Sequence, residues 1–400
     1  MKNRYRIWAA AAVLALLLIL CAAAGAEQKG TWGKLSWKLS DSGVLTISGK
    51  GGMEDIGDEE GDAWRPYRKQ IRQVEIRKGV TGIGNYAFKD CTRLKEVSLP
   101  AGLTRIGNFA FYDCPKLKSV DIPDSVAEIG AAAFKYCTGL ASFTFPEKVT
   151  VIEAGVLDWC SGLKEVGFKG AVTEIGFNAF DHCTALPEII LPGSVRSILE
   201  GAFTDCSSLI KITVPKGVKT ISRAVFKGCS GLAEITLPDT VTRIEDLAFY
   251  DCRSLKTLSL PAGVTKIGSY AFGYCSKLKE LTIPDGVKEI KRNTFTHCYA
   301  LKRMTIPKNI TKIGEEAFLK CTALAAVKIG TGVRTIGSGA FDGCKRLKNI
   351  TIKTKKLKTV GENSFRKIAG DAVFDCPKGM LKAYKKLLKG GGAPATAEYR

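Results

Sequence analysis

The stretch "IGNFAFYDCPKLKSVDIPDSV", Ile106 to Val126, has a close counterpart in "IGSYAFGYCSKLKELTIPDGV", Ile267 to Val287. Both place an alanine–phenylalanine pair, a cysteine, a short alternation of apolar and polar residues and a proline in the same order. A fixed period of this kind predicts a repeat protein in which each copy is one structural unit. Twelve cysteines mark the copies at intervals of 23 residues: Cys91, Cys114, Cys137, Cys160, Cys183, Cys206, Cys229, Cys252, Cys275, Cys298, Cys321 and Cys344.

Each copy predicts one coil that contains a short strand. In the copy that begins at Cys91, Val97 and Leu99 alternate with polar residues, which is typical of a strand with one buried face. Pro100 ends this strand because proline has no N–H for a further ladder hydrogen bond, and Gly107 permits a turn. Since one coil buries too little apolar surface to offset the entropy lost on ordering it, the copies must stack as a solenoid.

The repeat follows the pattern I-G-x-x-A-F-x-x-C-x-x-L-x-x-I-x-I-P-x-x-V over residues 68–366. In this pattern the chain resembles the BspA-like leucine-rich-repeat family of bacterial surface and secreted proteins. The resemblance implies a right-handed leucine-rich-repeat solenoid, built mainly of short parallel β-strands and turns and capped at both ends. Leu157 is the single residue that replaces phenylalanine. Other departures, such as the replacement of proline at Lys169, Gly330 and Lys353, affect local turns and not the fold.

The amino terminus has the parts of a secretory signal peptide, residues 1–26. The apolar stretch "IWAAAAVLALLLIL" is followed by the small-residue cleavage site "AGA", which ends at Ala26. A membrane helix is disfavoured by these small residues, and a lipid anchor at Cys21 is disfavoured by the bulky Leu20 before it. We therefore expect a secreted or cell-surface protein with no membrane span in the mature chain and no nucleic-acid partner. The cations that precede the apolar stretch are Lys2, Arg4 and Arg6.

Sequence that fits a cap flanks the repeats on both sides, and caps are needed because terminal coils would expose apolar edges. Residues 27–67 contain "KLSWKLSDSGVLTISGKG", which predicts two short strands joined by a Ser-Gly turn. Residues 367–400 predict a last strand, then a short amphipathic helix and a loose tail after Gly392. The side chains expected on the apolar side of that helix are Leu381, Tyr384 and Leu388.

The cysteines admit three interpretations: metal ligands, disulfides or packing residues. Paired strands of adjacent coils lie about 4.8 Å apart, a distance that suits a disulfide. In-register side chains point the same way, however, which strains the geometry of the bridge. We expect free buried thiols along the ladder, and an unpaired Cys376 in the carboxy-terminal cap.

The sequence predicts no catalytic residue, no metal site and no cofactor, and we expect the protein not to be an enzyme. The two histidines, His182 and His297, are five repeats or about 25 Å apart and cannot share a zinc ion. Neither can pair with the cysteine that follows it, because chain neighbours face different ways. One acidic loop lacks the spacing of a calcium loop and favours a solvated surface segment: Glu54, Asp55, Asp58, Glu59, Glu60 and Asp62.

The outward positions of the repeat predict columns on the solenoid surface. Hydroxyl residues stand between the inward pair of most strands, and lysines stand at the strand edge. Simple solubility is an alternative to binding for both columns. The hydroxyl column is Ser98, Thr144, Thr213, Thr236, Ser259, Thr282, Thr305 and Thr351, and the lysine column is Lys95, Lys118, Lys164, Lys256, Lys279, Lys302 and Lys348.

The position just before the cysteine offers candidate binding residues. Tyr136, Trp159 and His182 fall on three successive coils, and Tyr274 and His297 repeat the theme. We expect exposed aromatic clusters here, because aromatic side chains anchor protein interfaces and stack on sugars. The alternative is a set of partly buried turn residues with a structural role only.

The function that these patterns favour is binding. The resemblance implies a protein that engages host matrix proteins, other cells or glycans, and a rigid array of sites suits multivalent adhesion by a monomer. The formal charge is +21, of which +18 remains without residues 1–26. This excess supports the alternative of a cell-wall-associated scaffold that binds anionic polymers.

Overall fold

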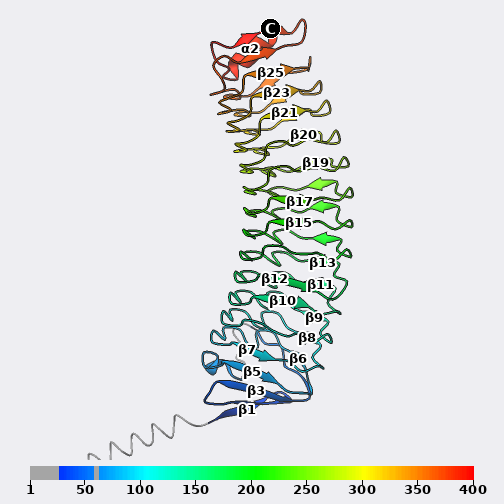
Figure 1. The fold of residues 1–400 in the computed structure, drawn as a ribbon, viewed down its shortest axis with the longest axis vertical. Coiled ribbons are helices and arrows are strands. Elements are labelled where there is room, and N and C mark those ends of the chain that lie inside the picture. The colour runs from blue at the N-terminus through cyan, green and yellow to red at the C-terminus, as the bar shows by residue number, and fades with distance from the viewer. Residues whose placement is uncertain (1–26, 58–62) are drawn as a thin grey trace, which may run out of the picture.

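The computed structural model describes residues 27–57 and 63–400. The predicted signal peptide with Cys21, and the acidic residues 58–62, lie outside the described residues. The described chain is an elongated, gently bent stack of coils that runs from β1 (Gln28–Trp32) to the cap around α2 (Leu381–Gly390) (Figure 1). The predicted solenoid of parallel strands is confirmed.

One side of the stack carries the predicted strands, each with its apolar residues inward. Their register repeats the sequence period, so that Ile212 pairs with Ile235 and Val327 with Ile350. The strands of this side are β3 (Val44–Gly49), β5 (Gln73–Ile76), β7 (Glu96–Ser98), β10 (Ser142–Phe145), β12 (Glu165–Phe168), β15 (Lys211–Thr213), β17 (Glu234–Thr236), β21 (Arg303–Ile306), β23 (Ala326–Ile329), β25 (Asn349–Ile352) and β27 (Val373–Asp375).

A second ladder, which the sequence did not predict as strand, follows each proline turn. Its inward isoleucine is buried in almost every coil, so Ile244 stacks between Ile221 and Ile267. These strands are β4 (Gly51–Gly52), β6 (Val80–Ile83), β8 (Arg105–Ile106), β9 (Glu128–Ile129), β11 (Val151–Ile152), β13 (Glu174–Ile175), β14 (Ser197–Ile198), β16 (Thr220–Ile221), β18 (Arg243–Ile244), β19 (Lys266–Ile267), β20 (Glu289–Ile290), β22 (Lys312–Ile313), β24 (Thr335–Ile336) and β26 (Thr359–Val360).

The core of the solenoid is a column of stacked phenylalanine rings, one from each coil. Neighbouring centroids lie 5.1 to 5.8 Å apart, from Phe88 to Phe134 and again from Phe180 to Phe365. All of these rings are fully buried. The inward direction of the repeated phenylalanine, on which the solenoid prediction depends, is therefore confirmed.

At Leu157 the column lacks its ring, and the neighbouring strand β10 supplies two. Phe143 packs edge-on against Phe134 at 5.0 Å between centroids, and Phe145 packs edge-on against Phe180 at 6.3 Å. Phe143 and Phe145 also contact each other at 4.8 Å. The aromatic core is thus continuous through the one coil that lacks the core phenylalanine.

The amino-terminal cap has one strand more than expected. β1 pairs antiparallel with β2 (Leu35–Leu39), β2 pairs antiparallel with β3, and β3 then pairs parallel with β5. Trp64, just before the short 3-10 helix Arg65–Tyr67, stacks on Phe88 at 5.7 Å and donates its indole N–H to Ala87 at 2.7 Å. A tryptophan therefore closes the column of phenylalanines at this end.

The carboxy-terminal cap corrects two expectations. The tail after Gly392 is not loose, because β28 (Glu398–Tyr399) pairs with β27 and Tyr399 stacks on Phe374 at 5.3 Å. Leu381 lies at the start of α2 and is 42% exposed, so it does not belong to the apolar side of the helix. Tyr384 is buried as expected.

Candidate binding surfaces

The residue before each cysteine from Cys91 to Cys344 has a left-handed backbone, with φ between 52° and 72°, and so does Lys367 at the equivalent place in the last coil, before Ile368. Its N–H still bonds to the next coil, as from Tyr136 to the carbonyl of Asp158 at 2.9 Å. A left-handed residue other than glycine costs about 1–2 kcal/mol, least for aspartate and asparagine. The residues at this position are Asp90, Asp113, Tyr136, Trp159, His182, Asp205, Gly228, Asp251, Tyr274, His297, Lys320, Gly343 and Lys367.

Three of these residues, Tyr136, Trp159 and His182, lie side by side on successive coils; we call them the aromatic column. Trp159 and His182 are stacked with 3.9 Å between ring centroids and 8° between planes, and Tyr136 lies 5.9 Å from Trp159. Trp159 is 41% exposed, while the other two are half-buried. The structure therefore brings these predicted residues together on the surface, and their binding role stays a prediction.

The aromatic surface extends beyond the residues that the sequence singled out. Tyr112 packs edge-on against Tyr136 at 5.3 Å, and Phe109 and Tyr86 continue the row towards the amino terminus. The ammonium of Lys89 lies 5.4 Å from the ring centre of Tyr112, in cation–π range. We missed these rings because they occupy other positions of the repeat, and only the coil geometry shows that those positions adjoin the aromatic column.

Carboxylates surround the histidine of the aromatic column. His182 Nδ1 lies 2.6 Å from Asp181 Oδ1, and His182 Nε2 lies 3.5 Å from Asp205 Oδ2. On the preceding coil, Asp158 Oδ2 accepts a bond from Lys135 Nζ at 2.6 Å. Burial raises the pKa of Asp158 and of Asp181. Neither aspartate was predicted from the sequence, although the two stand one period apart beside a histidine.

The second predicted pair differs from the first. Tyr274 and His297 are stacked at 4.4 Å, but His297 is only 9% exposed, so the expectation of an exposed histidine is wrong here. The hydroxyl of Thr296 bonds His297 Nδ1 at 2.9 Å, and Tyr299 packs edge-on against the imidazole. Burial and the nearby charge of Lys320 lower the pKa of His297.

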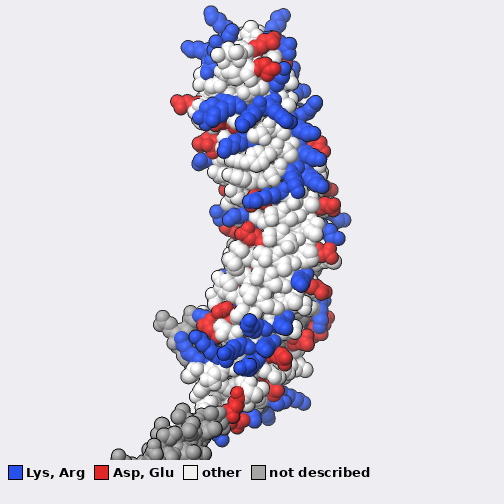
Figure 2. All heavy atoms as spheres, turned by 60° about the vertical axis from the view of Figure 1, so that its left-hand side comes forward, with Lys and Arg blue, Asp and Glu red and all other residues white. Residues whose placement is uncertain are grey.

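The strand side carries the predicted columns in register. Thr213 pairs with Thr236, and all seven lysines of the lysine column are exposed. Ile190 takes the hydroxyl position in one coil and is 80% exposed. Figure 2 shows Lys and Arg gathered towards the two ends of one face, with a largely uncharged stretch between them.

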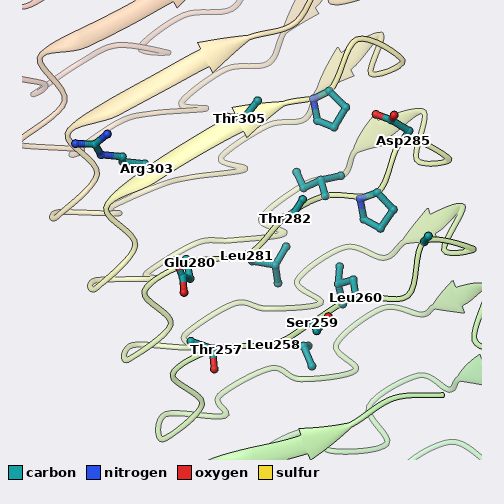
Figure 3. A pocket seen from close by; sticks show the side chains of 14 residues that line it. Thr257, Leu258, Ser259, Leu260, Glu280, Leu281, Thr282, Asp285, Arg303 and Thr305 are labelled. Atoms are coloured by element: carbon teal, nitrogen blue, oxygen red, sulfur yellow. The ribbon is translucent and has the colours of Figure 1, made fainter. Parts of the chain in front are cut away.

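A groove of about 770 Å³ opens on this side where the strand ladder thins to the single bridge between Thr257 and Glu280. Leu258 and Leu281 lie in the middle of the groove, with Glu280 and Arg303 towards one end of it (Figure 3). A polar rim with an apolar middle suits an extended peptide or a saccharide chain. A groove of about 580 Å³ repeats this arrangement around Ile190, at the bridge between Glu188 and Lys211.

The acidic loop and the cysteine ladder both have structural partners. Asp55 of the loop accepts hydrogen bonds from Asn85 N at 2.9 Å and Arg105 Nη1 at 2.8 Å, so it is tied to the first coils. From Cys114 to Cys344, each thiol donates to a carbonyl of the preceding coil at 3.0 to 3.3 Å. Burial raises the pKa of thiols such as Cys229, which disfavours the reactive thiolate.

Comparison with known families decides the classification. The model of the BspA-type leucine-rich repeat region, six copies long, matches residues 67–184, 152–279 and 242–370. The chain belongs to the BspA-type leucine-rich repeat family. The family resemblance inferred from the repeat pattern is confirmed, and no curated protein matches the chain.

Solved structures of similar proteins support the same assignment. The BspA-type chain is 25% identical to a leucine-rich repeat protein from Bacteroides ovatus, with a TM-score of 0.77 and coverage of 93% of this chain and 99% of that one. It is 28% identical to a leucine-rich cell surface protein from Faecalibacterium prausnitzii, with a TM-score of 0.53 and coverage of 83% and 96%. A leucine-rich repeat protein from Eubacterium ventriosum is 26% identical, with a TM-score of 0.57 and coverage of 86% and 96%.

These matches place the BspA-type chain among bacterial repeat proteins that include a cell-surface protein, and they favour a binding or scaffold role. Within residues 27–57 and 63–400, no helix has the length and apolar character that crossing a bilayer requires.

Proposed function

We propose that the chain is a secreted or cell-surface binding protein, adhesin-like, that engages a protein or a glycan through the side of the solenoid bearing the aromatic column. The observation that carries the proposal is the stack of Trp159 on His182, 3.9 Å apart, which leaves Trp159 41% exposed. A ring that is held rigid and partly exposed loses little entropy on binding, and such rings anchor protein and sugar ligands.

The partners we propose are host matrix or cell-surface proteins, or glycans of the cell wall. The similarity to a leucine-rich cell surface protein supports a location where such partners are met. The grooves at Leu281 and Ile190 lie on the strand side and give contact points separate from the aromatic column. Several modest sites at fixed spacing raise the avidity for a polymeric ligand without any strong single site.

The test is binding of the purified chain to panels of matrix proteins, glycans and cell walls, with Trp159→Gly as the variant. Glycine suits the left-handed backbone at this position, where φ is 59°, so the fold is not expected to suffer. The matched control is Lys320→Gly, which has the same backbone position with φ of 57° and no ring. Trp159→Gly should weaken binding of the panel ligand while Lys320→Gly leaves it unchanged; equal affinities for both variants would refute the role of the aromatic column.

A second candidate is the wall scaffold, which the charge favours. The lysine column is exposed throughout, and cations gather towards both ends of one face (Figure 2). Binding through these lysines should fall steeply between about 0.05 and about 0.5 M salt, because exposed charges are screened over a few ångströms at high salt. Retention on cell walls that is salt-sensitive but indifferent to Trp159→Gly would favour the scaffold over the adhesin-like role.

A further inference from the structure

Three groups of the metal-ligand type converge at the end of the aromatic column. Asp158 comes from one coil, and Asp181 and His182 come from the next, one period further along the chain. One ligand atom from each lies within 4.8 Å of the other two. Among residues 27–57 and 63–400, no other three histidine, cysteine or acidic side chains approach in this way.

Each of these three side chains has one buried atom that makes no hydrogen bond of acceptable geometry. These atoms are Asp158 Oδ1, Asp181 Oδ1 and His182 Nδ1. Asp181 Oδ1 and His182 Nδ1 lie 2.6 Å apart without such a bond. The side chain of Asp158 is only 6% exposed, so water does not solvate it freely. Buried polar atoms without partners are rare and costly, and one cation would satisfy all three at once.

We propose that Asp158, Asp181 and His182 form a binding site for a divalent metal ion of the zinc type. Two carboxylate oxygens and one imidazole nitrogen make the mixed donor set that zinc accepts, with a fourth position left for water or for a ligand. Calcium and magnesium prefer oxygen donors alone, so the imidazole disfavours them. Lys135 pairs with Asp158 Oδ2 and neutralises part of the charge, and Asp158 Oδ1 stays without a hydrogen-bond partner.

Neighbouring groups hold the imidazole in a suitable orientation. Its Nε2 faces Asp205 Oδ2 at 3.5 Å, and Trp159 covers one ring face at 3.9 Å. A histidine ligand typically presents its second nitrogen to a carboxylate, which fixes the tautomer and strengthens the metal bond. The stack with Trp159 limits rotation of the ring, so less entropy is lost when the ion binds.

The chain contains an internal control for this site. His297 occupies the same position of the repeat, with φ of 59° and an aromatic ring stacked on it, as His182 does. Where Asp158 and Asp181 stand beside His182, the equivalent positions beside His297 are Gly273 and Thr296. The backbone and the ring stack are thus shared, whereas His297 lacks the carboxylates, bonds Thr296 and is more deeply buried against Tyr299.

The experiment is calorimetric titration of the metal-free, untagged chain with Zn²⁺, in a Cys376→Ser background that removes the half-buried thiol. We expect one ion per chain. Asp181→Asn and His182→Gln should each abolish binding, Asp205→Asn should weaken it about 10- to 100-fold, and His297→Gln should leave it unchanged. No zinc binding by the parent chain, or full affinity in Asp181→Asn, would overturn the proposal.

A second measurement needs no variant and so does not depend on any variant's folding. The full sequence has only two histidines, so imidazole nitrogen NMR reports two rings. Saturating Zn²⁺ should shift the signals of one ring, that of His182. The spectrum of His297→Gln, in which His182 is the one remaining histidine, assigns these signals. Unchanged imidazole spectra, or a shift confined to His297, would contradict the site. Neither readout depends on the adhesin-like function, so the two proposals fail independently.

Discussion

Replacing Leu157 by phenylalanine would restore the aromatic residue in the one coil that lacks it, and we predict that the change destabilises the protein. Phe143 and Phe145 already fill the gap between Phe134 and Phe180, with ring contacts of 5.0 and 6.3 Å. Leu157 itself is fully buried. Because protein interiors are close-packed, a further ring must therefore displace the neighbouring side chains.

The magnitude follows from the cost of overpacking a well-packed core. Added carbon atoms in such a core cost about 1–3 kcal/mol of unfolding free energy. Phe143→Val alone should also destabilise, by less than the roughly 3–5 kcal/mol of a phenylalanine-to-alanine change. The new ring of Leu157→Phe can enter the space that Phe143→Val vacates. The double variant should therefore lose about 0.5–3 kcal/mol less unfolding free energy than the two single variants lose together.

The assay is guanidinium denaturation of the four proteins of this cycle, followed by circular dichroism. Leu163→Phe serves as the control. Leu163 is also fully buried in this region, but its position in the repeat is not the one that phenylalanine occupies in the other coils, so Phe143 does not stand in for a missing ring there. Phe143→Val should not rescue Leu163→Phe. A neutral or stabilising Leu157→Phe, or additive effects in the double variant, would refute the account of how β10 fills the column.

Three further predictions concern single side chains. Tyr384→Phe should lower stability by about 1–3 kcal/mol, because the lost hydroxyl accepts from Leu357 N at 3.1 Å and donates to Thr354 O at 3.0 Å; faster hydrogen exchange at Leu357 would report it. The folded chain lowers the pKa of His297 from 6.5, so it favours the neutral imidazole. The contribution of this imidazole to stability is therefore present above pH 6.5 and is lost as the pH falls through the pKa of the folded state. The stability difference between the parent chain and His297→Gln should therefore shrink from about pH 8 to about pH 5, and a constant difference would count against it. Among the thirteen cysteines that the structure describes, a thiol reagent should modify the half-buried Cys376 first and the buried ladder only on unfolding, as mass spectrometry of the labelled peptides would show.

The solenoid could be predicted because a constant repeat length fixes which positions of neighbouring coils lie side by side. Because the coils from Cys91 to Cys344 all have 23 residues, equivalent positions meet on neighbouring coils, as the register of Ile212 with Ile235 shows. The rescue of Leu157 by β10 could not be predicted, because it depends on which side chains cross the core. The order of the tail at Tyr399 likewise depends on the free edge of β27, which only the folded chain reveals.

The aromatic column was predictable for the same reason, and its surroundings were not. Tyr136, Trp159 and His182 share one position of the repeat, so stacking follows directly from the period. Asp158 and Asp181 each stand two residues before a cysteine. They lie close to the imidazole of His182 only because the shape of the turn brings these side chains together. Burial of His297 depends on Tyr299, which follows the cysteine and folds back on the ring.

The backbone of the turn also bears on why aromatic residues stand in this column. A left-handed residue such as Trp159 loses about 1–2 kcal/mol relative to a relaxed backbone, and a stacked pair regains about 0.5–1.5 kcal/mol. The two effects nearly cancel, so the fold gains little from tryptophan where glycine stands at Gly228 and Gly343. Meanwhile Trp159 keeps 41% of its surface in solvent. A side chain that the fold does not need, and that stays accessible, is free to make the contact outside the chain that we propose, and this is why Trp159→Gly should separate binding from stability.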